Sequence, residues 1–213
     1  MSTLLRFLFF AGIVRPILLL AVGIHARGRA LLPQRGPAIV VANHNSHLDT
    51  LTIISLFPLH LLSKLRPVAA MDYFMRTKAM AWFATRIIGI IAIARGGRDR
   101  NVNPLAPCED ALDRGEILIL FPEGSRGEPE KLQAFKKGVA HLAKQRPEVP
   151  VYPLFISGLG KVLPKDALFL VPFNCDVVVG EPLQWNGSIE GFMELLRMRI
   201  EILASQIHAA PWE

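Results

Sequence analysis

The sequence is poor in cysteine, with only Cys108 and Cys175 among its 213 residues. These two lie far apart and neither belongs to a C-x-x-C pair. The sequence therefore predicts neither a disulfide framework nor a cysteine zinc site. A reducing setting such as the cytosol is the simplest interpretation. Internal repeats and low-complexity stretches are also missing, which excludes repeat architectures and disordered tracts.

Acidic residues are outnumbered: 18 aspartates and glutamates stand against 24 lysines and arginines, giving a net charge of +6 and a pI near 9.7. A basic surface suits nucleic acid, anionic lipid or a phosphorylated small molecule. Because the chain has no motif typical of nucleic-acid binding, we expect no nucleic-acid partner. The alternative is that the excess charge only keeps the protein soluble.

The chain also has no apolar run long and clean enough to cross a bilayer, which takes about 20 mostly uncharged residues. Residues 4–24 are nearly all apolar, but they are interrupted by Arg6 and by Arg15 followed by Pro16. An arginine in mid-membrane is costly, and the proline invites a kink or a second helix start. We therefore expect two short helices that lie in one leaflet.

Arginines 27, 29 and 35 follow this segment and are expected at the level of the lipid headgroups. The predicted organisation is an N-terminal membrane-associated helical motif at residues 1–30 and an α/β domain at residues 31–213. Two alternatives stay open. A cleaved signal peptide would need one unbroken apolar region, and a single tilted span would need an arginine that reaches the interface.

Short apolar runs alternate with helical patterns from residue 37 onward. Strands are predicted at 37–43, 67–71, 90–94, 116–121, 149–156 and 175–179, and helices at 48–56, 73–88, 103–114, 136–145 and 188–207. In the second helix the residues spaced as a buried face are Phe74, Ala81, Trp82 and Ile88. Because most strands are continuously apolar, we predict a single α/β domain with a mostly parallel central sheet flanked by helices. The 51% hydrophobic composition supplies its core.

Three polar clusters follow predicted strands, at residues 44–49, 95–100 and 123–126. In parallel α/β sheets, ligands bind beyond the carboxyl ends of the strands. The coincidence of three clusters at such ends is the strongest structural indication of a functional site.

The first cluster holds His44 and Asp49. A histidine can remove a proton from a hydroxyl, and a carboxylate on its other ring nitrogen fixes the tautomer and raises its basicity. A spacing of five separates two side chains on a regular helix, so His44 is expected in the loop before the helix. The alternatives are a helix cap or a metal site that also uses His47 and Glu123. The sequence has no H-E-x-x-H motif, and we predict no metal.

The other two clusters contain groups suited to a polar or anionic ligand. Gly124 allows close backbone approach, while Glu123 and Arg126 offer opposite charges across a turn, or alternatively form a structural salt bridge. Arg95 could hold a phosphate, or could belong to a solvated basic turn. Residues 135–138 open a predicted helix whose N-terminus favours anions.

Together, these clusters resemble the glycerolipid acyltransferase family, most closely its bacterial lysophosphatidate acyltransferases. Four motifs occur in the family's order over residues 37–182: Asn43-His44-x-Ser46-x-x-Asp49, Gly89 to Arg95, Phe121-Pro122-Glu123-Gly124-Ser125-Arg126-Gly127, and Val149-Pro150-Val151-Tyr152-Pro153. The first and third motifs, at this separation, carry the resemblance.

The resemblance implies roles for the matching positions. His44 would be the general base and Asp49 its orienting partner. The residues that would bind the glycerol-phosphate of the acceptor are Arg95, Glu123, Gly124, Ser125 and Arg126. The co-substrate would be acyl-coenzyme A or acyl carrier protein, with no further cofactor. The protein would lie at the cytoplasmic face of a bacterial inner (plasma) membrane, held by its N-terminal helices.

The function implied is transfer of a fatty acyl group from a thioester to the free hydroxyl of a lysophospholipid. The expected acceptor is 1-acyl-glycerol-3-phosphate, and the product is phosphatidate. The alternatives are an acyltransferase or transacylase acting on another lysophospholipid, and a non-catalytic membrane-surface protein.

Overall fold

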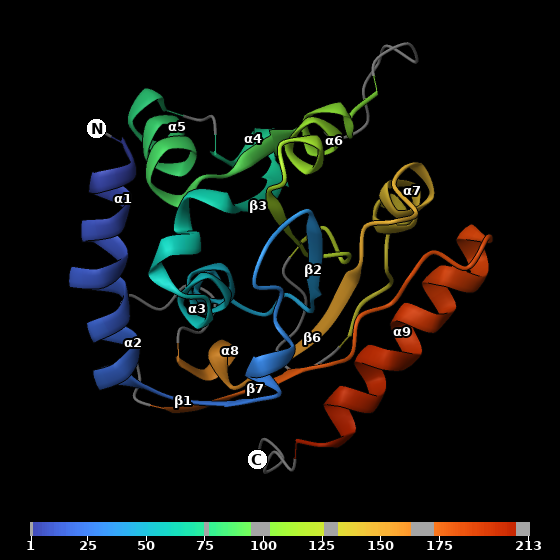
Figure 1. The fold of residues 1–213 in the computed structure, drawn as a ribbon. Helices are drawn as coiled ribbons and strands as arrows, with labels where there is room; N and C mark the ends of the chain where they lie inside the picture. The colour runs from blue at the N-terminus through green and yellow to red at the C-terminus, as the bar shows by residue number, and fades with distance from the viewer. Residues whose placement is uncertain (1, 75–76, 95–102, 126–131, 163–172, 208–213) are drawn as a thin grey trace.

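The computed structural model describes residues 2–74, 77–94, 103–125, 132–162 and 173–207. Within these ranges the core is a seven-stranded sheet of order β1-β7-β6-β2-β5-β3-β4 (Figure 1). The strands are β1 (Val22–Arg27), β2 (Ala38–Ala42), β3 (Leu65–Ala70), β4 (Ile91–Ile93), β5 (Ile117–Leu120), β6 (Val151–Ser157) and β7 (Phe173–Val179).

The helices of the described residues are α1 (Ser2–Phe9), α2 (Arg15–Ala21), α3 (Leu48–Leu56), α4 (Met71–Phe74), α5 (Lys78–Phe83), α6 (Ala106–Asp113), α7 (Gly138–Gln145), α8 (Leu159–Val162) and α9 (Ile189–Ser205). Two 3₁₀ turns, η2 (Arg29–Leu31) and η3 (Leu59–Lys64), and two π-helical segments, η1 (Phe10–Val14) and η4 (Ala84–Ile88), complete them.

The sheet is mostly parallel, as predicted, and β6 with β7 is its antiparallel pair. β1 runs parallel to β7 at the sheet edge, so these two strands run in the direction opposite to that of the other five. The sequence prediction missed β1, because its residues continue the apolar N-terminal segment. Residues 22–27 belong to the sheet, so the N-terminal helical segment ends at Ala21, and the predicted motif at residues 1–30 includes β1.

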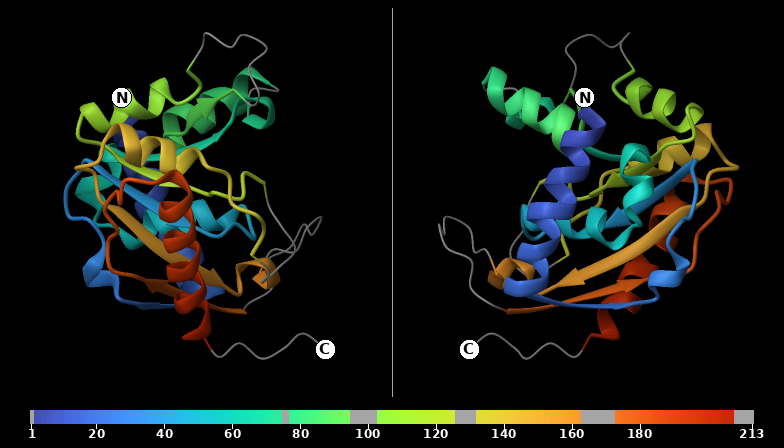
Figure 2. Two further views of the ribbon diagram at one scale, coloured as in Figure 1. Left: turned by 90° about the vertical axis from the view of Figure 1, so that its right-hand side faces the viewer. Right: turned by 60° about the vertical axis from the view of Figure 1, so that its left-hand side comes forward.

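Both faces of the sheet are covered, which explains the continuous apolar strands. Alternate residues of β2 point to opposite faces. Val40 belongs to a core cluster shared with the N-terminal helix and α3. Val41 belongs to a second cluster shared with α6, α7 and α9. Figure 2 shows the N-terminal helix and α9 on different sides of the sheet.

Residues 2–21 form one uninterrupted helical segment of α1, η1 and α2. The residues at its junctions, Phe9, Val14 and Arg15, all have right-handed helical backbone angles. The two predicted helices therefore continue into one another. Pro16 lies in the first turn of α2, two residues after the π-helical segment ends at Val14, and the first turn of a helix tolerates proline. Contrary to the expectation from the sequence, residues 3–20 form a helix long and apolar enough to cross a membrane by length and composition.

One stripe of this helix packs against the domain. Its buried members, spaced four residues apart, are Arg6, Phe10, Val14 and Leu18. The Arg6 guanidinium donates hydrogen bonds to the carbonyl oxygens of Leu65, at 3.0 Å, and Ile88, at 2.8 Å. Arg6, which interrupts the apolar sequence of the helix, therefore binds the helix to the domain.

Residues 77–88 differ from the predicted buried helix. Thr77 caps α5 by accepting a hydrogen bond from the Met80 backbone N–H, and the buried contacts come from η4, through Ala84, Ile87 and Ile88. Trp82, predicted on the buried face, is 52% exposed. The change to the π-helical period in η4 shifts the residues that face the domain. The side chain of Phe74 lies outside the described part.

We expect Arg6→Met to lower the free energy of unfolding by about 1–3 kcal/mol, because it leaves two buried carbonyls without their donor. Arg86→Met, at an exposed arginine, is the matched control and should change little. Urea unfolding in mild detergent measures both. Equal stability of the two variants would contradict the proposed role of Arg6.

Candidate active site

The first and third polar clusters meet at the carboxyl ends of two neighbouring strands. β2 pairs in parallel with β5, and Val41 lies opposite Leu120. His44 follows β2 by two residues, and Phe121 follows β5 directly. The sheet thus brings together His44 and Glu123, which are 79 residues apart in the sequence.

His44 and Asp49 form a hydrogen-bonded pair, with 2.9 Å between His44 Nδ1 and Asp49 Oδ2. α3 begins at Leu48, so Asp49 lies in its first turn and His44 in the preceding loop, as the spacing predicted. The Asp49 side chain is fully buried, while that of His44 is 18% exposed. Because the Asp49 carboxylate is a hydrogen-bond acceptor, we assign the ring proton of neutral His44 to Nδ1. Nε2 then has a free lone pair and can accept a proton.

The same carboxylate oxygen also fixes the loop. Asp49 Oδ2 accepts the backbone N–H groups of Asn45, at 2.6 Å, and Ser46, at 2.8 Å. Short bonds of this kind to a carboxylate are stronger than neutral ones. The loop is therefore folded around the carboxylate that orients the imidazole.

Asn43, which directly precedes His44, ties the loop to the other neighbouring strand. Its side-chain amide donates to the carbonyl of Ile156 and accepts from the N–H of Ile156, both at 2.8 Å. Ile156 belongs to β6, the strand of the proline-containing motif, and Asn43 is 2% exposed. A buried two-sided bond of this kind fixes the backbone just before the imidazole.

Glu123 lies on the other side of His44. Its Oε1 accepts the backbone N–H of His44 at 3.2 Å, and the residue is 4% exposed. Burial raises the pKa of Glu123 above its ordinary value, against the lowering effect of the His44 N–H and of His44 itself. The backbone N–H of Gln133 also lowers the pKa of this carboxyl, although no hydrogen bond of good geometry from a described residue reaches the buried Oε2.

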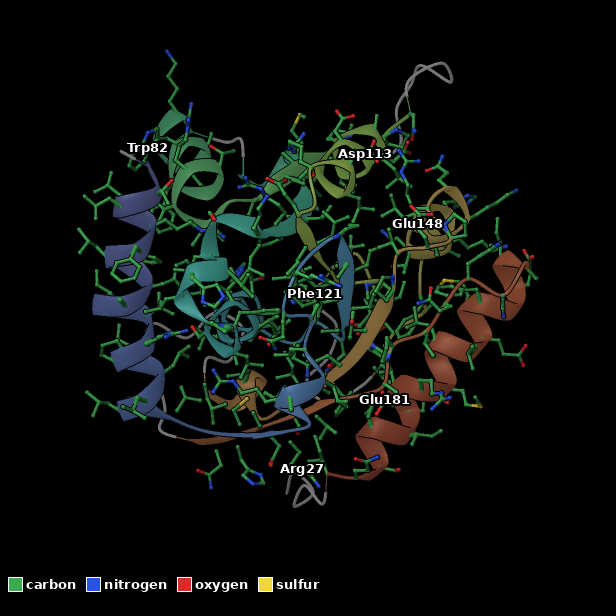
Figure 3. All side chains as sticks on the ribbon, in the orientation of Figure 1. Arg27, Trp82, Asp113, Phe121, Glu148 and Glu181 are labelled. Atoms are coloured by element: carbon green, nitrogen blue, oxygen red, sulfur yellow. The ribbon has the colours of Figure 1, made fainter. Side chains whose placement is uncertain are left out.

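The Phe121 ring stacks on the imidazole, with centroids 4.1 Å apart and an angle of 22° between the planes. Phe121 is labelled near the centre of the view in Figure 3. The His44 ring is thus held on one edge by Asp49 and on one face by Phe121. The sequence prediction missed this contact, because a phenylalanine at a strand end is indistinguishable from a core residue.

Gly124 and Ser125 follow Glu123 in a turn. Gly124 has a φ of +72°, a conformation that favours glycine. A Cβ there would lie 2.5 Å from the Lys136 Nζ, so the lysine amine lies directly over the turn. Ser125 is exposed. The sequence assigned residues 135–138 to a helix start, but α7 begins at Gly138, and Lys136 lies before it, bonded through its N–H to the Pro122 carbonyl.

Arg95 and Arg126, both predicted to bind the acceptor phosphate, lie outside the described residues. The strand before Arg95, β4, is at the sheet edge and is separated from β5 by β3. Among the residues that the structure places, no group of three or more histidine, cysteine, aspartate or glutamate side chains is arranged to hold a metal ion.

The arrangement can accept a proton at His44 Nε2 and hold the resulting imidazolium against the buried Asp49 carboxylate. The carboxyl of Glu123 and the amine of Lys136 offer polar contacts beside it. This combination suits removal of a proton from a hydroxyl on a polar, phosphate-bearing molecule.

The comparisons with known proteins agree with the fold and the predicted family. A family profile described as Acyltransferase matches residues 23–157, so the chain belongs to this family. A solved structure, the 1-acyl-sn-glycerophosphate acyltransferase PlsC from Thermotoga maritima, superposes with a TM-score of 0.77 at 22% identity and covers 98% of this chain and 83% of that one. This likeness shows the fold.

Curated relatives are named 1-acyl-sn-glycerol-3-phosphate acyltransferases. One from Chlamydomonas reinhardtii is 30% identical, over 86% of this chain and 55% of its own length. The alpha enzyme of Mus musculus is 28% identical, over 79% and 58%. A chloroplast enzyme of Arabidopsis thaliana is 28% identical, over 69% and 39%. The chain therefore spans about two to three fifths of the length of these relatives.

The raised pKa of Glu123 predicts a pH-dependent cost to stability. The unfolded chain ionises this glutamate near its ordinary pKa of 4.5, while the folded chain keeps the proton to higher pH. The contribution of Glu123 to the free energy of unfolding is therefore fully present below about pH 4.5, and it is lost as the pH rises through the raised pKa of the folded chain. Glu123→Gln removes this titration, so its stability relative to wild type should increase as the pH rises from 4 to 7.

Urea unfolding of both proteins at several pH values measures this difference. Glu181→Gln, at an exposed glutamate, is the control. A stability difference for Glu123→Gln that stays constant or falls over this range would contradict the assignment.

Proposed function

We propose that this chain is a membrane-associated acyltransferase that transfers a fatty acyl group from a thioester to the hydroxyl of 1-acyl-glycerol-3-phosphate, which gives phosphatidate. The observation that carries the proposal is the pair of His44 with the buried Asp49 beside Glu123. This pair occurs in a chain that belongs to the acyltransferase family. The names of the curated relatives support the choice of acceptor.

The chemistry follows from the orientation of the imidazole. With the proton on Nδ1 bonded to Asp49, Nε2 removes the proton of the acceptor hydroxyl as its oxygen attacks the thioester carbonyl carbon. The tetrahedral intermediate expels the thiolate, which takes the proton back from the imidazolium. The products are an ester and a free thiol, and His44 is returned to its starting state.

A covalent acyl-enzyme is unnecessary in this route, because the thioester is already activated. The proposal therefore includes no metal and no bound cofactor. Acyl-coenzyme A or acyl carrier protein serves as co-substrate. The donors that stabilise the oxyanion are expected to be backbone N–H groups.

The acceptor headgroup is assigned to the turn after β5. The buried Oε2 of Glu123 can accept a hydrogen bond from a substrate hydroxyl, while Gly124 and Ser125 allow close approach. Lys136, over this turn, adds a cation for phosphate. Arg95 and Arg126 keep their predicted role as phosphate ligands.

The N-terminal helix is assigned to the membrane surface. Its inner stripe packs on the domain, and its outer residues are apolar, with Leu19 and Leu20 81% and 85% exposed. Arg6 and Arg15 both donate to backbone carbonyls of the domain. A helix held in this way lies on one leaflet. We place the protein on the cytoplasmic face of a bacterial inner membrane.

Removing the base tests the mechanism. His44→Ala should lower kcat by about 10²–10⁴-fold, and Asp49→Asn should also lower it strongly, because the wrong tautomer is then presented. Transfer of labelled acyl groups from acyl-coenzyme A to a panel of lysophospholipids by purified protein measures both the rate and the acceptor. His60→Ala, at an exposed histidine, is the matched control.

Full activity of His44→Ala would overturn the assignment of the base. Transfer without added acyl-coenzyme A, drawn from another phospholipid, would support the transacylase instead. Preference for a different lysophospholipid would replace the proposed acceptor while leaving the base in place.

Phe121 is predicted to be a positioning residue. Phe121→Leu should reduce kcat about tenfold with a smaller effect on KM, because the imidazole loses the ring that holds its face. Phe121→Tyr, which keeps the stack, should recover most of the loss. If the leucine and tyrosine variants fall equally, the ring fills space and does not orient His44.

A further inference from the structure

The exposed apolar side chains of the described residues are concentrated on one part of the molecule. On the N-terminal helix the large ones are Leu4, Leu5, Phe7, Leu8, Ile13, Ile17, Leu19 and Leu20, and on α4 and α5 they are Met71, Met80, Trp82 and Phe83. The remaining two, Met198 and Ile202, lie on α9. Surface patches of this kind mark interaction sites when they are contiguous.

The two groups are contiguous because α5 continues into η4, which packs against α1, and because the last residue of α5 contacts the N-terminal helix. Phe83 meets Phe9 edge to face, with ring centroids 5.3 Å apart. Figure 2 shows the two helices side by side when the left of Figure 1 is turned toward the viewer. In Figure 3, Trp82 is labelled beside the N-terminal half of α1. The exposed part of α5 therefore extends the apolar surface of the N-terminal helix.

The charge around this surface is mostly basic, and Asp72, beside Met71 on α4, is an exposed acidic exception. The sequence contains no acidic residue before Asp49, and none from residue 73 to residue 98, which includes all of α5 and η4. Lys78 and Arg86 are both exposed there. An apolar helix face bordered by lysine and arginine fits the surface of an anionic bilayer.

We propose that α5 is a second membrane-binding element, which inserts Met80 and Trp82 into the interface beside the N-terminal helix. Trp82 is suited to this position because its amphipathic ring prefers the headgroup level. The proposal rests on the proposed function only in that the substrate is a lipid. Contact with the bilayer through both the N-terminal helix and α5 would fix the orientation of the domain, whereas contact through the N-terminal helix alone would allow the domain to rotate about the axis of that helix.

Vesicle binding of the full chain tests this. Met80→Ser/Trp82→Ser should bind vesicles of phosphatidylglycerol and phosphatidylethanolamine at least about tenfold more weakly than wild type, because apolar area is lost from the interface. The matched control, Met198→Ser/Ile202→Ser, changes two side chains that are each 46% exposed on α9, and it should bind as wild type does. Lys78→Gln/Arg86→Gln should lose binding to these vesicles more than to pure phosphatidylcholine vesicles.

Unchanged binding of the α5 variant, or equal loss in the α9 control, would overturn the proposal. So would a wild-type dimer in the absence of lipid that the α5 variant converts to a monomer, because the surface would then bind a second copy. Acyl transfer in detergent micelles is measured in parallel and should be unchanged in the α5 variant. If wild type transfers no acyl group but the α5 variant still loses vesicle binding, only the proposed function fails.

Discussion

The site depends on one buried oxygen, Oδ2 of Asp49, which accepts from the His44 ring and from the N–H groups of Asn45 and Ser46. A buried carboxylate without such donors would be costly, so the loop and the charge stabilise each other. The sheet supplies the rest. β5 brings Glu123 to one side of the loop, and β6 holds Asn43 on the other. The imidazole is placed by three strands that are far apart in the sequence.

Much of this arrangement could be predicted from local pattern. The buried run at β2 followed by a polar cluster located the strand end, and the predicted helix from Leu48 to Leu56 agrees with α3 residue for residue. The five-residue spacing of His44 and Asp49 required the histidine to precede the helix, as it does. The adjacency of the first and third clusters followed from the rule for parallel sheets. The roles of these residues remain predictions for kinetics to test.

Other features depended on long-range packing that no local pattern encodes. The first half of β1, residues 22–24, continues the apolar run of the helix before it, and β1 forms a strand by pairing with β7 at the sheet edge. From the sequence, Arg6 was treated as a charge that would be costly inside the membrane. In the structure it donates to backbone carbonyls 59 and 82 residues away. Trp82 was assigned to a buried face by helical spacing, which the π-helical η4 changes. Lys136 was grouped with a helix N-terminus, although its amine lies over Gly124.

The most direct test of the central claim is the tautomer of His44 in the resting protein. Correlation spectra of ¹⁵N-histidine-labelled protein at neutral pH, with the His44 signals identified by their loss in His44→Gln, report which ring nitrogen carries hydrogen. We expect a proton on Nδ1 in a strong hydrogen bond with Asp49, and we expect this proton signal to be lost in Asp49→Asn. A neutral ring protonated on Nε2 in the wild-type protein would contradict it, because the nitrogen assigned as the base would then hold no free lone pair.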